Sequence, residues 1–199
     1  MSKISATITA LGAYVPEHIL SNAMLENMVD TNDEWITART GIKERRILKE
    51  NGKGTSYLAI NAAKDLIKKA ELDPSTIDLV IVATATPDMK AASTASFTAT
   101  AIGACNAFSF DMDSACSGFL FGMSTAASYI ESGRYKKILL IGADKMSSIV
   151  NYKDRTTCII FGDGAGAALF EPNFDGLGIQ DQYLRTCLLY TSPSPRDLR

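Results

Sequence analysis

The sequence contains few of the residues on which metal sites and disulfide frameworks depend. Its 199 residues include four cysteines, none of them in a CxxC pair, and a single histidine, His18. The lack of a CxxC pair and the single histidine argue against a zinc site, so we predict no metal centre. We also expect no disulfides, because we place the chain in a reducing compartment. Each cysteine is therefore interpreted singly, as a core residue or as a nucleophile.

The sequence also lacks an excess of either charge and any long apolar run. Twenty Lys and Arg residues oppose 22 Asp and Glu residues, and the basic residues do not cluster, which argues against nucleic-acid binding. No stretch reaches the ~18 to 20 apolar residues of a membrane span. Residues 1–7 have no apolar core of the secretory type. We expect a cytoplasmic protein.

What is present is an alternation of apolar strands and helices. The helix predicted over residues 55–70 has apolar residues at helical spacing and two lysines in its last turn. The nearly continuous apolar run 77–83 is typical of a parallel strand that is covered on both faces. We predict an α/β fold of βαβαβαββ type, with a mainly parallel central sheet covered by helices. Further strands are expected over residues 4–15, 107–113, 137–142, 158–161 and 166–170, and further helices over 22–28, 32–41, 93–104 and 117–132.

The last residues do not continue this pattern. Residues 1–186 are interpreted as one domain-like unit, whereas 187–199 resemble translated sequencing-adapter DNA. The alternative is a flexible tail rich in serine and proline.

Cys116 is the strongest candidate for a catalytic residue. It lies in Asp113-Ser114-Ala115-Cys116-Ser117-Gly118-Phe119, between a predicted strand and a predicted helix. Unpaired backbone N–H groups at a helix N-terminus favour a thiolate, the reactive form of cysteine, and can bind an oxyanion. The alternative is a buried cysteine acting as a small apolar residue, which is the commoner role. Cys105 is expected in a loop, and Cys158 at the head of a strand.

Gly162-Asp163-Gly164-Ala165-Gly166-Ala167 fits a loose dinucleotide-binding pattern. That motif requires a helix to follow, but residues 167–172 are predicted to form a strand that ends at Pro172. We therefore interpret these glycines as allowing a tight turn and close packing.

Three blocks of sequence resemble β-ketoacyl-acyl-carrier-protein synthase III. They are the Cys116 segment, Asn32-Asp33-Glu34-Trp35-Ile36 followed by Arg39-Thr40-Gly41-Ile42, and Asp154-Arg155 followed by residues 159–167. They occur in the family's order and at its spacing. The resemblance implies the N-terminal half of a dimeric thiolase-fold condensing enzyme, with a C-terminal half that this chain lacks.

The resemblance also implies an activity in type II fatty-acid synthesis. Cys116 would accept an acyl group, usually acetyl, from acyl-coenzyme A, and the acyl-cysteine would condense with malonyl-acyl carrier protein. Acyl-coenzyme A would be a substrate, and no cofactor is expected. The family's catalytic His and Asn lie in its second half, so we expect this chain alone not to condense. His18 matches no catalytic position and is expected at the surface.

Four residues match the family's coenzyme A contacts. Trp35 and Arg155 match positions that stack on the adenine, Arg39 a position near the phosphates, and Thr31 a nearby polar contact. From composition alone, Trp35 is more typically a packing residue and the arginines are surface charges. Ala91 stands where the family commonly has a phenylalanine that reaches across the dimer, which leaves the acyl preference open and predicts a roomier pocket.

Two alternative functions stay open. One is another condensing chemistry of the thiolase superfamily, such as a polyketide starter synthase or a hydroxymethylglutaryl-type synthase. The other is a truncated, non-catalytic dimerisation or binding fragment. The Trp35 and Arg155 blocks favour the synthase III interpretation.

Overall fold

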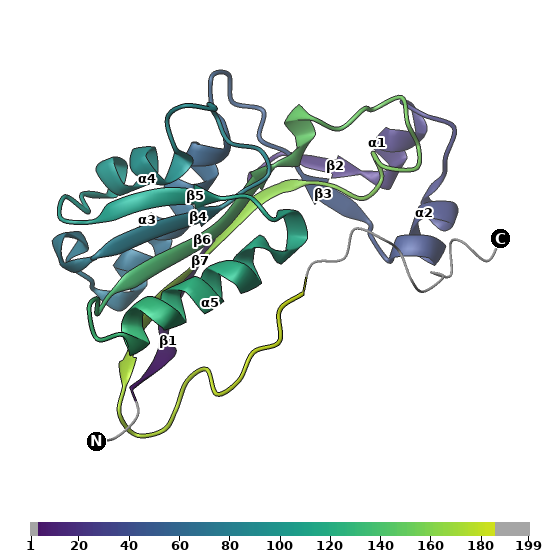
Figure 1. Cartoon of the computed structure of the whole chain (residues 1–199). Coiled ribbons are helices and arrows are strands. Elements are labelled where there is room, and N and C mark those ends of the chain that lie inside the picture. The colour runs from purple at the N-terminus through teal and green to yellow at the C-terminus, as the bar shows by residue number, and fades with distance from the viewer. Residues whose placement is uncertain (1–3, 186–199) are drawn as a thin grey trace.

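A five-stranded mixed sheet forms the centre of the protein (Figure 1). The computed structural model describes residues 4–185. The strand order is β1-β7-β6-β4-β5. β4 is parallel to β5 and β6, whereas β7 is antiparallel to both β6 and β1. Four strands thus run in one direction, which confirms the predicted mainly parallel sheet. The strands are β1 (Ser5–Tyr14), β4 (Leu79–Ala83), β5 (Phe108–Met112), β6 (Ile138–Lys145) and β7 (Asp163–Asn173).

Helices cover both faces of this sheet. α3 (Thr55–Ala70) and α4 (Thr94–Ile102) lie on one face, and α5 (Gly118–Glu131) lies on the other (Figure 1). β4 is fully buried, and its side chains alternate between two cores. Val80 and Val82 pack on the α3 side, while Leu79 and Ile81 pack on the α5 side. Burying each such side chain contributes roughly 1.5–3 kcal/mol, and this explains why the apolar run has no polar face.

A small lobe extends beyond the carboxyl ends of the parallel strands. It contains β2 (Ile19–Ser21) and β3 (Glu44–Arg46), which pair antiparallel, and the helices α1 (Asn22–Glu26) and α2 (Asp33–Thr40). Its own core includes Leu25 and Ile36 and is separate from the two sheet cores. These two short strands were not predicted from the sequence.

The βαβαβαββ order is confirmed in the main sheet by β1, α3, β4, α4, β5, α5, β6 and β7. α3 has the predicted bounds. The strand predicted over residues 158–161 is wrong, because these residues form a turn that packs into the core of the lobe. The tight turn predicted at the glycines of residues 162–167 is wrong as well, because Gly164 and Gly166 lie inside β7. The predicted tail, 187–199, lies outside the described residues.

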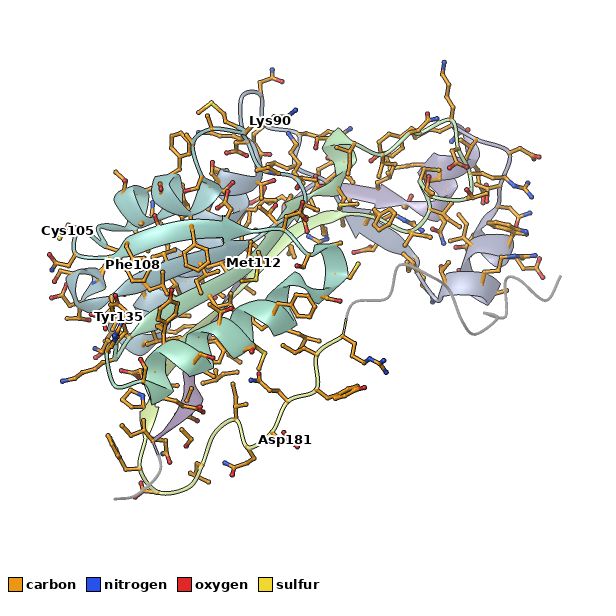
Figure 2. All side chains as sticks on the ribbon, in the orientation of Figure 1. Lys90, Cys105, Phe108, Met112, Tyr135 and Asp181 are labelled. Atoms are coloured by element: carbon orange, nitrogen blue, oxygen red, sulfur yellow. The ribbon has the colours of Figure 1, made fainter. Side chains whose placement is uncertain are left out.

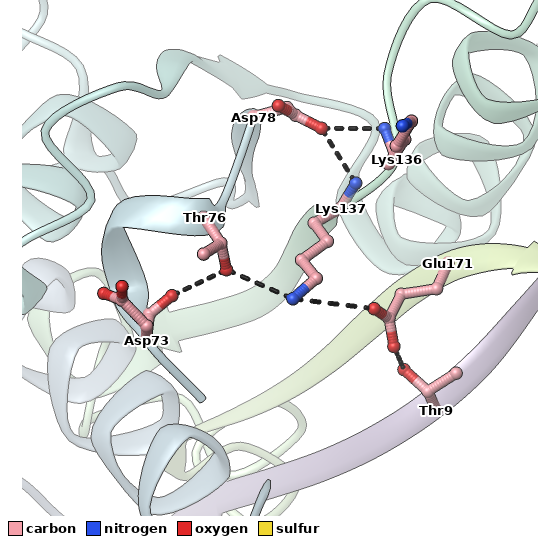
Figure 3. Close-up of polar contacts among 7 residues, drawn as sticks. All are labelled: Thr9, Asp73, Thr76, Asp78, Lys136, Lys137 and Glu171. Carbon is pink, nitrogen blue, oxygen red and sulfur yellow. Dashed lines mark hydrogen bonds and ion pairs between the residues drawn. The ribbon is translucent and has the colours of Figure 1, made fainter. Parts of the chain in front are cut away.

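Polar contacts join the elements at the amino ends of β4 and β6 (Figure 3). The Lys137 Nζ donates to the Thr76 Oγ1 at 3.2 Å and lies 3.9 Å from a Glu171 carboxylate oxygen. The other Glu171 oxygen accepts from the Thr9 hydroxyl at 2.6 Å. Asp78 accepts two backbone N–H groups just before β6, at 2.7 and 2.9 Å. Each of these polar groups has a hydrogen-bond or ion-pair partner, so we assign them a structural role at this end of the sheet.

Candidate active site

Cys116 lies on a single 3-10 turn that joins β5 to α5. The turn spans Ala115–Ser117 and follows two residues after the end of β5. Cys116 is exposed, and Ala115 has a φ of 45°. This left-handed conformation costs a non-glycine residue about 1–3 kcal/mol, so the surrounding packing must hold the turn in place. The predicted position of Cys116 between a strand and a helix is confirmed.

The first turns of α5 rest directly on the sheet. A Cβ added to Gly118 would lie 3.2 Å from the Ala83 Cβ, and one added to Gly122 would lie 2.5 Å from a Leu140 methyl group. A side chain at either position would force its neighbour to shift. The helix start, and with it the Cys116 turn, therefore rests on Ala83 at the carboxyl end of β4, and the next turn of α5 rests on Leu140 of β6. A rigid support of this kind suits a nucleophile that must meet a substrate in one geometry.

Two carboxylates near these strand ends hold loops in place. Asp111 on β5 accepts the first two backbone N–H groups of α4, both at 2.7 Å. Asp144 on β6 accepts the Thr84 hydroxyl at 3.0 Å and the Thr86 hydroxyl at 2.9 Å. Both anchor the ends of the loop 84–93, which carries Ala91. We did not identify these roles from the sequence, because they depend on which strands are neighbours.

A second cluster forms around Trp35 in the lobe. Asn32 caps α2 by accepting the Trp35 N–H at 2.7 Å, and Gly41 ends the helix with a φ of 72°. Trp35 and Arg39 are one turn apart and share a helix face. The Arg39 guanidinium carbon lies 4.2 Å from the centre of the indole ring, and that of Arg155 lies 4.9 Å from it. The structure thus brings together three of the four predicted coenzyme A contacts.

Thr31 and Asp30 complete this cluster on the loop before α2. Arg155 donates to the Asp30 carbonyl at 2.9 Å and contacts its carboxylate at 3.4 Å. The Thr31 hydroxyl oxygen is buried and has no hydrogen-bond partner within residues 4–185. A buried hydroxyl without a partner is costly, so an incoming polar group would be favoured there.

The space between Trp35 and Arg155 is closed in this structure. A flat base between them would need about 3.5 Å of separation on each of its faces, or about 7 Å in total, whereas the two groups are 4.9 Å apart. Arg155 is exposed, so its side chain has room to rotate away. Occupation of this site by a base therefore requires the Arg155 side chain to move.

The other described cysteines differ from Cys116. Cys105 is exposed in the turn between α4 and β5, before the amino end of β5, whereas Cys116 follows its carboxyl end. Cys158 is fully buried, and burial raises the pKa of its thiol, with a further contribution from Asp154. Raising the pKa suppresses the thiolate, so Cys158 is structural. His18 is half-buried rather than at the surface, because its Nε2 lies inside the protein.

A buried arginine in the lobe was missed from the sequence. Arg45 on β3 is 4% exposed and contacts the Ile159 carbonyl and the Asn22 side chain. The adjacent Arg46 is half-exposed and pairs with Glu44 at 3.5 Å. In a strand, consecutive side chains point to opposite faces, so a recognised β3 would have shown that one arginine faces inward.

Sequence and structure comparisons agree with this architecture. A family model described as 3-oxoacyl-[acyl-carrier-protein] synthase III matches residues 110–186. The chain is 59% identical over 186 residues to beta-ketoacyl-[acyl-carrier-protein] synthase III 2 of Bacteroides thetaiotaomicron, a match that covers 94% of this chain and 56% of that protein. The chain therefore spans little more than half the length of this relative.

Two crystal structures are similar over most of the described chain. 3-Oxoacyl-[acyl-carrier-protein] synthase III of Aquifex aeolicus has a TM-score of 0.82 and 46% identity, covering 85% of this chain and 55% of the other. The priming beta-ketosynthase of the R1128 polyketide pathway has a TM-score of 0.81 and 34% identity, covering 84% and 50%.

The sheet, its helices and the cysteine at the β5–α5 junction define a thiolase-fold protein of the condensing-enzyme class. Within that class, the chain is similar to β-ketoacyl-acyl-carrier-protein synthase III, by the family model over residues 110–186 and by the 59% identity to the Bacteroides protein. Within residues 4–185, no helix is both long and apolar enough to span a membrane.

Proposed function

We propose that Cys116 accepts an acyl group, typically acetyl, from acyl-coenzyme A as the first step of a condensation that initiates type II fatty-acid synthesis. The observation that carries this proposal is the exposed Cys116 on the turn between β5 and α5. The sulfur is accessible, and the backbone beneath it is held by the packing of Gly118 and Gly122. Similarity to synthase III proteins supports the same chemistry.

In this step the Cys116 thiolate attacks the carbonyl carbon of the thioester. A C–S bond forms to Cys116, and the bond to the coenzyme A sulfur breaks, so that coenzyme A leaves as a thiolate and takes up a proton. Backbone N–H groups at the turn and at the start of α5 would stabilise the oxyanion that develops in between. The acyl-cysteine then conserves the thioester for the next step.

The Trp35 cluster would bind the nucleotide end of coenzyme A. Trp35 and Arg155 would stack on the adenine, with Arg155 moving to admit it, and Arg39 would lie near the phosphates. The unpartnered Thr31 hydroxyl would contact a polar group of the ligand. The lobe lies beyond the strand ends that carry the Cys116 turn (Figure 1). A ligand as long as coenzyme A suits that arrangement.

In a dimer, the acyl end of the substrate would meet the loop 84–93 of the neighbouring subunit. Lys90, labelled in Figure 2, lies on this loop. Ala91 offers a methyl group where an aromatic ring is common in the family, so we propose a pocket that accepts acyl groups larger than acetyl. We also propose a homodimer, since β5 is an edge strand with one neighbour in the described sheet.

The second step would use malonyl-acyl carrier protein. Decarboxylation of the malonyl group releases carbon dioxide and leaves a carbanion, which attacks the acyl-cysteine carbonyl and frees the Cys116 thiolate. We propose that the His and Asn serving this step belong to the remaining length of the natural protein. The 199-residue chain would then accept an acyl group without condensing it.

Incubation with acetyl-coenzyme A tests the first step. We expect one acetyl group, located by peptide mass spectrometry on Cys116 and absent from a Cys116→Ala variant. Cys105→Ala is the matched control, because Cys105 is also exposed but lies away from the turn. In this variant Cys116 should still be acetylated. Acetylation retained in Cys116→Ala, or none in the parent protein, would refute the assignment.

A second candidate is the priming step of polyketide synthesis. The similarity to the R1128 priming ketosynthase favours it, and so does the small Ala91 side chain. Competition between acetyl-coenzyme A and longer acyl-coenzyme A esters for Cys116 separates the two. Preferential labelling by acetyl would favour fatty-acid initiation, and preferential labelling by a longer acyl group would favour the polyketide role.

A further inference from the structure

Arg45 is a buried cation that connects β3 to the turn carrying Arg155. It is 4% exposed. Its Nε donates to the Ile159 carbonyl oxygen at 2.9 Å, and a second guanidinium nitrogen donates to the same oxygen. The adjoining backbone is equally close, because a Cβ added to Gly162 would lie 3.1 Å from the Arg46 carbonyl oxygen. Side chain and backbone thus both tie residues 159–162 to β3.

The same guanidinium is joined to the start of α2 through Asn22. Arg45 donates to the Asn22 side-chain oxygen. The Asn22 amide nitrogen in turn donates to the Asp33 carboxylate at 2.7 Å and to the Ile42 carbonyl at 2.9 Å. Asp33 is the first residue of α2, the helix that presents Trp35 and Arg39, and Ile42 follows the end of that helix. One buried cation therefore connects both sides of the Trp35 cluster.

The turn between Arg155 and Ile159 is stiff enough to transmit this constraint. The Asp154 carbonyl accepts the Cys158 N–H at 3.1 Å, and the Asp154 carboxylate accepts the hydroxyl groups of Thr156 and Thr157, both at 2.7 Å. Fixing the Ile159 carbonyl consequently fixes the backbone from which the Arg155 side chain extends.

Burying a guanidinium among carbonyl and amide oxygens is expensive. Burial lowers the pKa of Arg45, and the neighbouring Cys158 and Tyr152 oppose this shift. A methionine or leucine would fill the same space without that cost. The hydrogen bonds of Arg45 to the Ile159 carbonyl and to the Asn22 side chain therefore explain why an arginine occupies this buried position.

We infer that Arg45 is a positioning residue: it fixes the backbone that places Arg155 beside Trp35, and from there the Arg155 side chain rotates to admit the adenine of coenzyme A and then stack on it. It touches neither the indole nor the expected ligand and acts through the Ile159 carbonyl. The inference rests on the proposed function for its consequence in binding. Its geometric part, the placement of Arg155 over Trp35, is testable without any ligand.

Trp35 is the only tryptophan of the 199-residue chain, so its fluorescence reports on this cluster alone. In Arg45→Met, release of Arg155 from the indole face should raise acrylamide quenching of Trp35 about twofold. Arg46→Met is the matched control, because it removes the adjacent, half-exposed arginine, and it should leave quenching unchanged. Equal quenching in Arg45→Met and the parent protein would overturn the inference.

Titration with coenzyme A then tests the consequence for binding. We expect Arg45→Met and Arg155→Met each to weaken binding about tenfold, and the double variant also about tenfold, because residues that act through one contact are not additive. A hundredfold loss in the double variant would show that Arg45 acts independently of Arg155 and would overturn the inference.

Two further outcomes are distinguishable. If circular dichroism shows that Arg45→Met does not fold, Arg45→Lys decides, with an expected loss of about threefold because one ammonium nitrogen replaces the two guanidinium nitrogens that contact the Ile159 carbonyl. Unchanged binding in Arg45→Lys would then overturn the inference. Failure of the parent protein to bind coenzyme A would refute the proposed function instead, and acrylamide quenching would still decide the role of Arg45.

Discussion

Gly12→Ala should separate α3 from β1. The added Cβ would lie 2.4 Å from the Ala62 carbonyl oxygen, 2.5 Å from the Leu66 nitrogen and 2.7 Å from the Leu66 Cβ. Ordinary contacts begin near about 3.5 Å, so strand and helix must part by about 1 Å. The opposing atoms belong to helix backbone and a buried Cβ, which cannot rotate aside. We expect the upper end of the overpacking range, a loss of about 3 kcal/mol in the free energy of unfolding.

Thermal unfolding followed by far-ultraviolet circular dichroism measures this loss. For a domain of this size, about 3 kcal/mol corresponds to a fall of about 6–12 °C in Tm. Gly166→Ala on the neighbouring β7 is the matched control, because its Cβ would meet nothing within 4 Å, and its effect should stay within about 0.5 kcal/mol. Equal Tm values for the two variants would refute the close-packing argument.

Two other predictions concern pH and a buried carboxylate. Burial, followed by the Tyr57 hydroxyl, raises the pKa of Tyr14 from 10.0 to about 12, so folding disfavours the phenolate. The free energy of unfolding should therefore fall as the pH rises from 10 to 12. Urea titrations across this range should show a smaller fall in Tyr14→Phe. Asp163 is 4% exposed and accepts the Leu48 N–H, the Ser147 N–H and the Ser147 hydroxyl at 2.6–2.8 Å. Asp163→Asn should therefore cost about 2–3 kcal/mol in urea unfolding, whereas the same change at the exposed Asp181 (Figure 2) should have no effect.

The regular elements of the main sheet could be predicted because their patterns are long. α3 combines helical spacing with two terminal lysines, and its bounds agree with those predicted. β2 and β3 are three residues each, which is too short for any periodicity to appear. The run at Cys158 is apolar because it fills the core of the lobe, and a short apolar run does not distinguish a buried strand from a buried turn.

The parts of the candidate site that are formed by residues close in sequence could be predicted. The position of Cys116 follows from the strand and helix on either side of it, and the contact of Trp35 with Arg39 follows from their spacing on α2. The approach of Arg155 to the same ring joins residues that are distant in sequence, and only the family resemblance indicated it. The inward orientation of Arg45 depends on a strand that was not recognised, so its role emerged only from the structure.

The pairing of β1 with β7 has a consequence for biosynthesis. Ser5 lies opposite Asn173, and β1 has no other strand neighbour in the described sheet. A newly made β1 must therefore wait until about 160 further residues have left the ribosome, which takes roughly 10–30 s at ordinary translation rates. During that interval the backbone N–H and C=O groups of β1 have no strand partner. This strand is consequently where we expect trigger-type chaperones to bind the growing polypeptide.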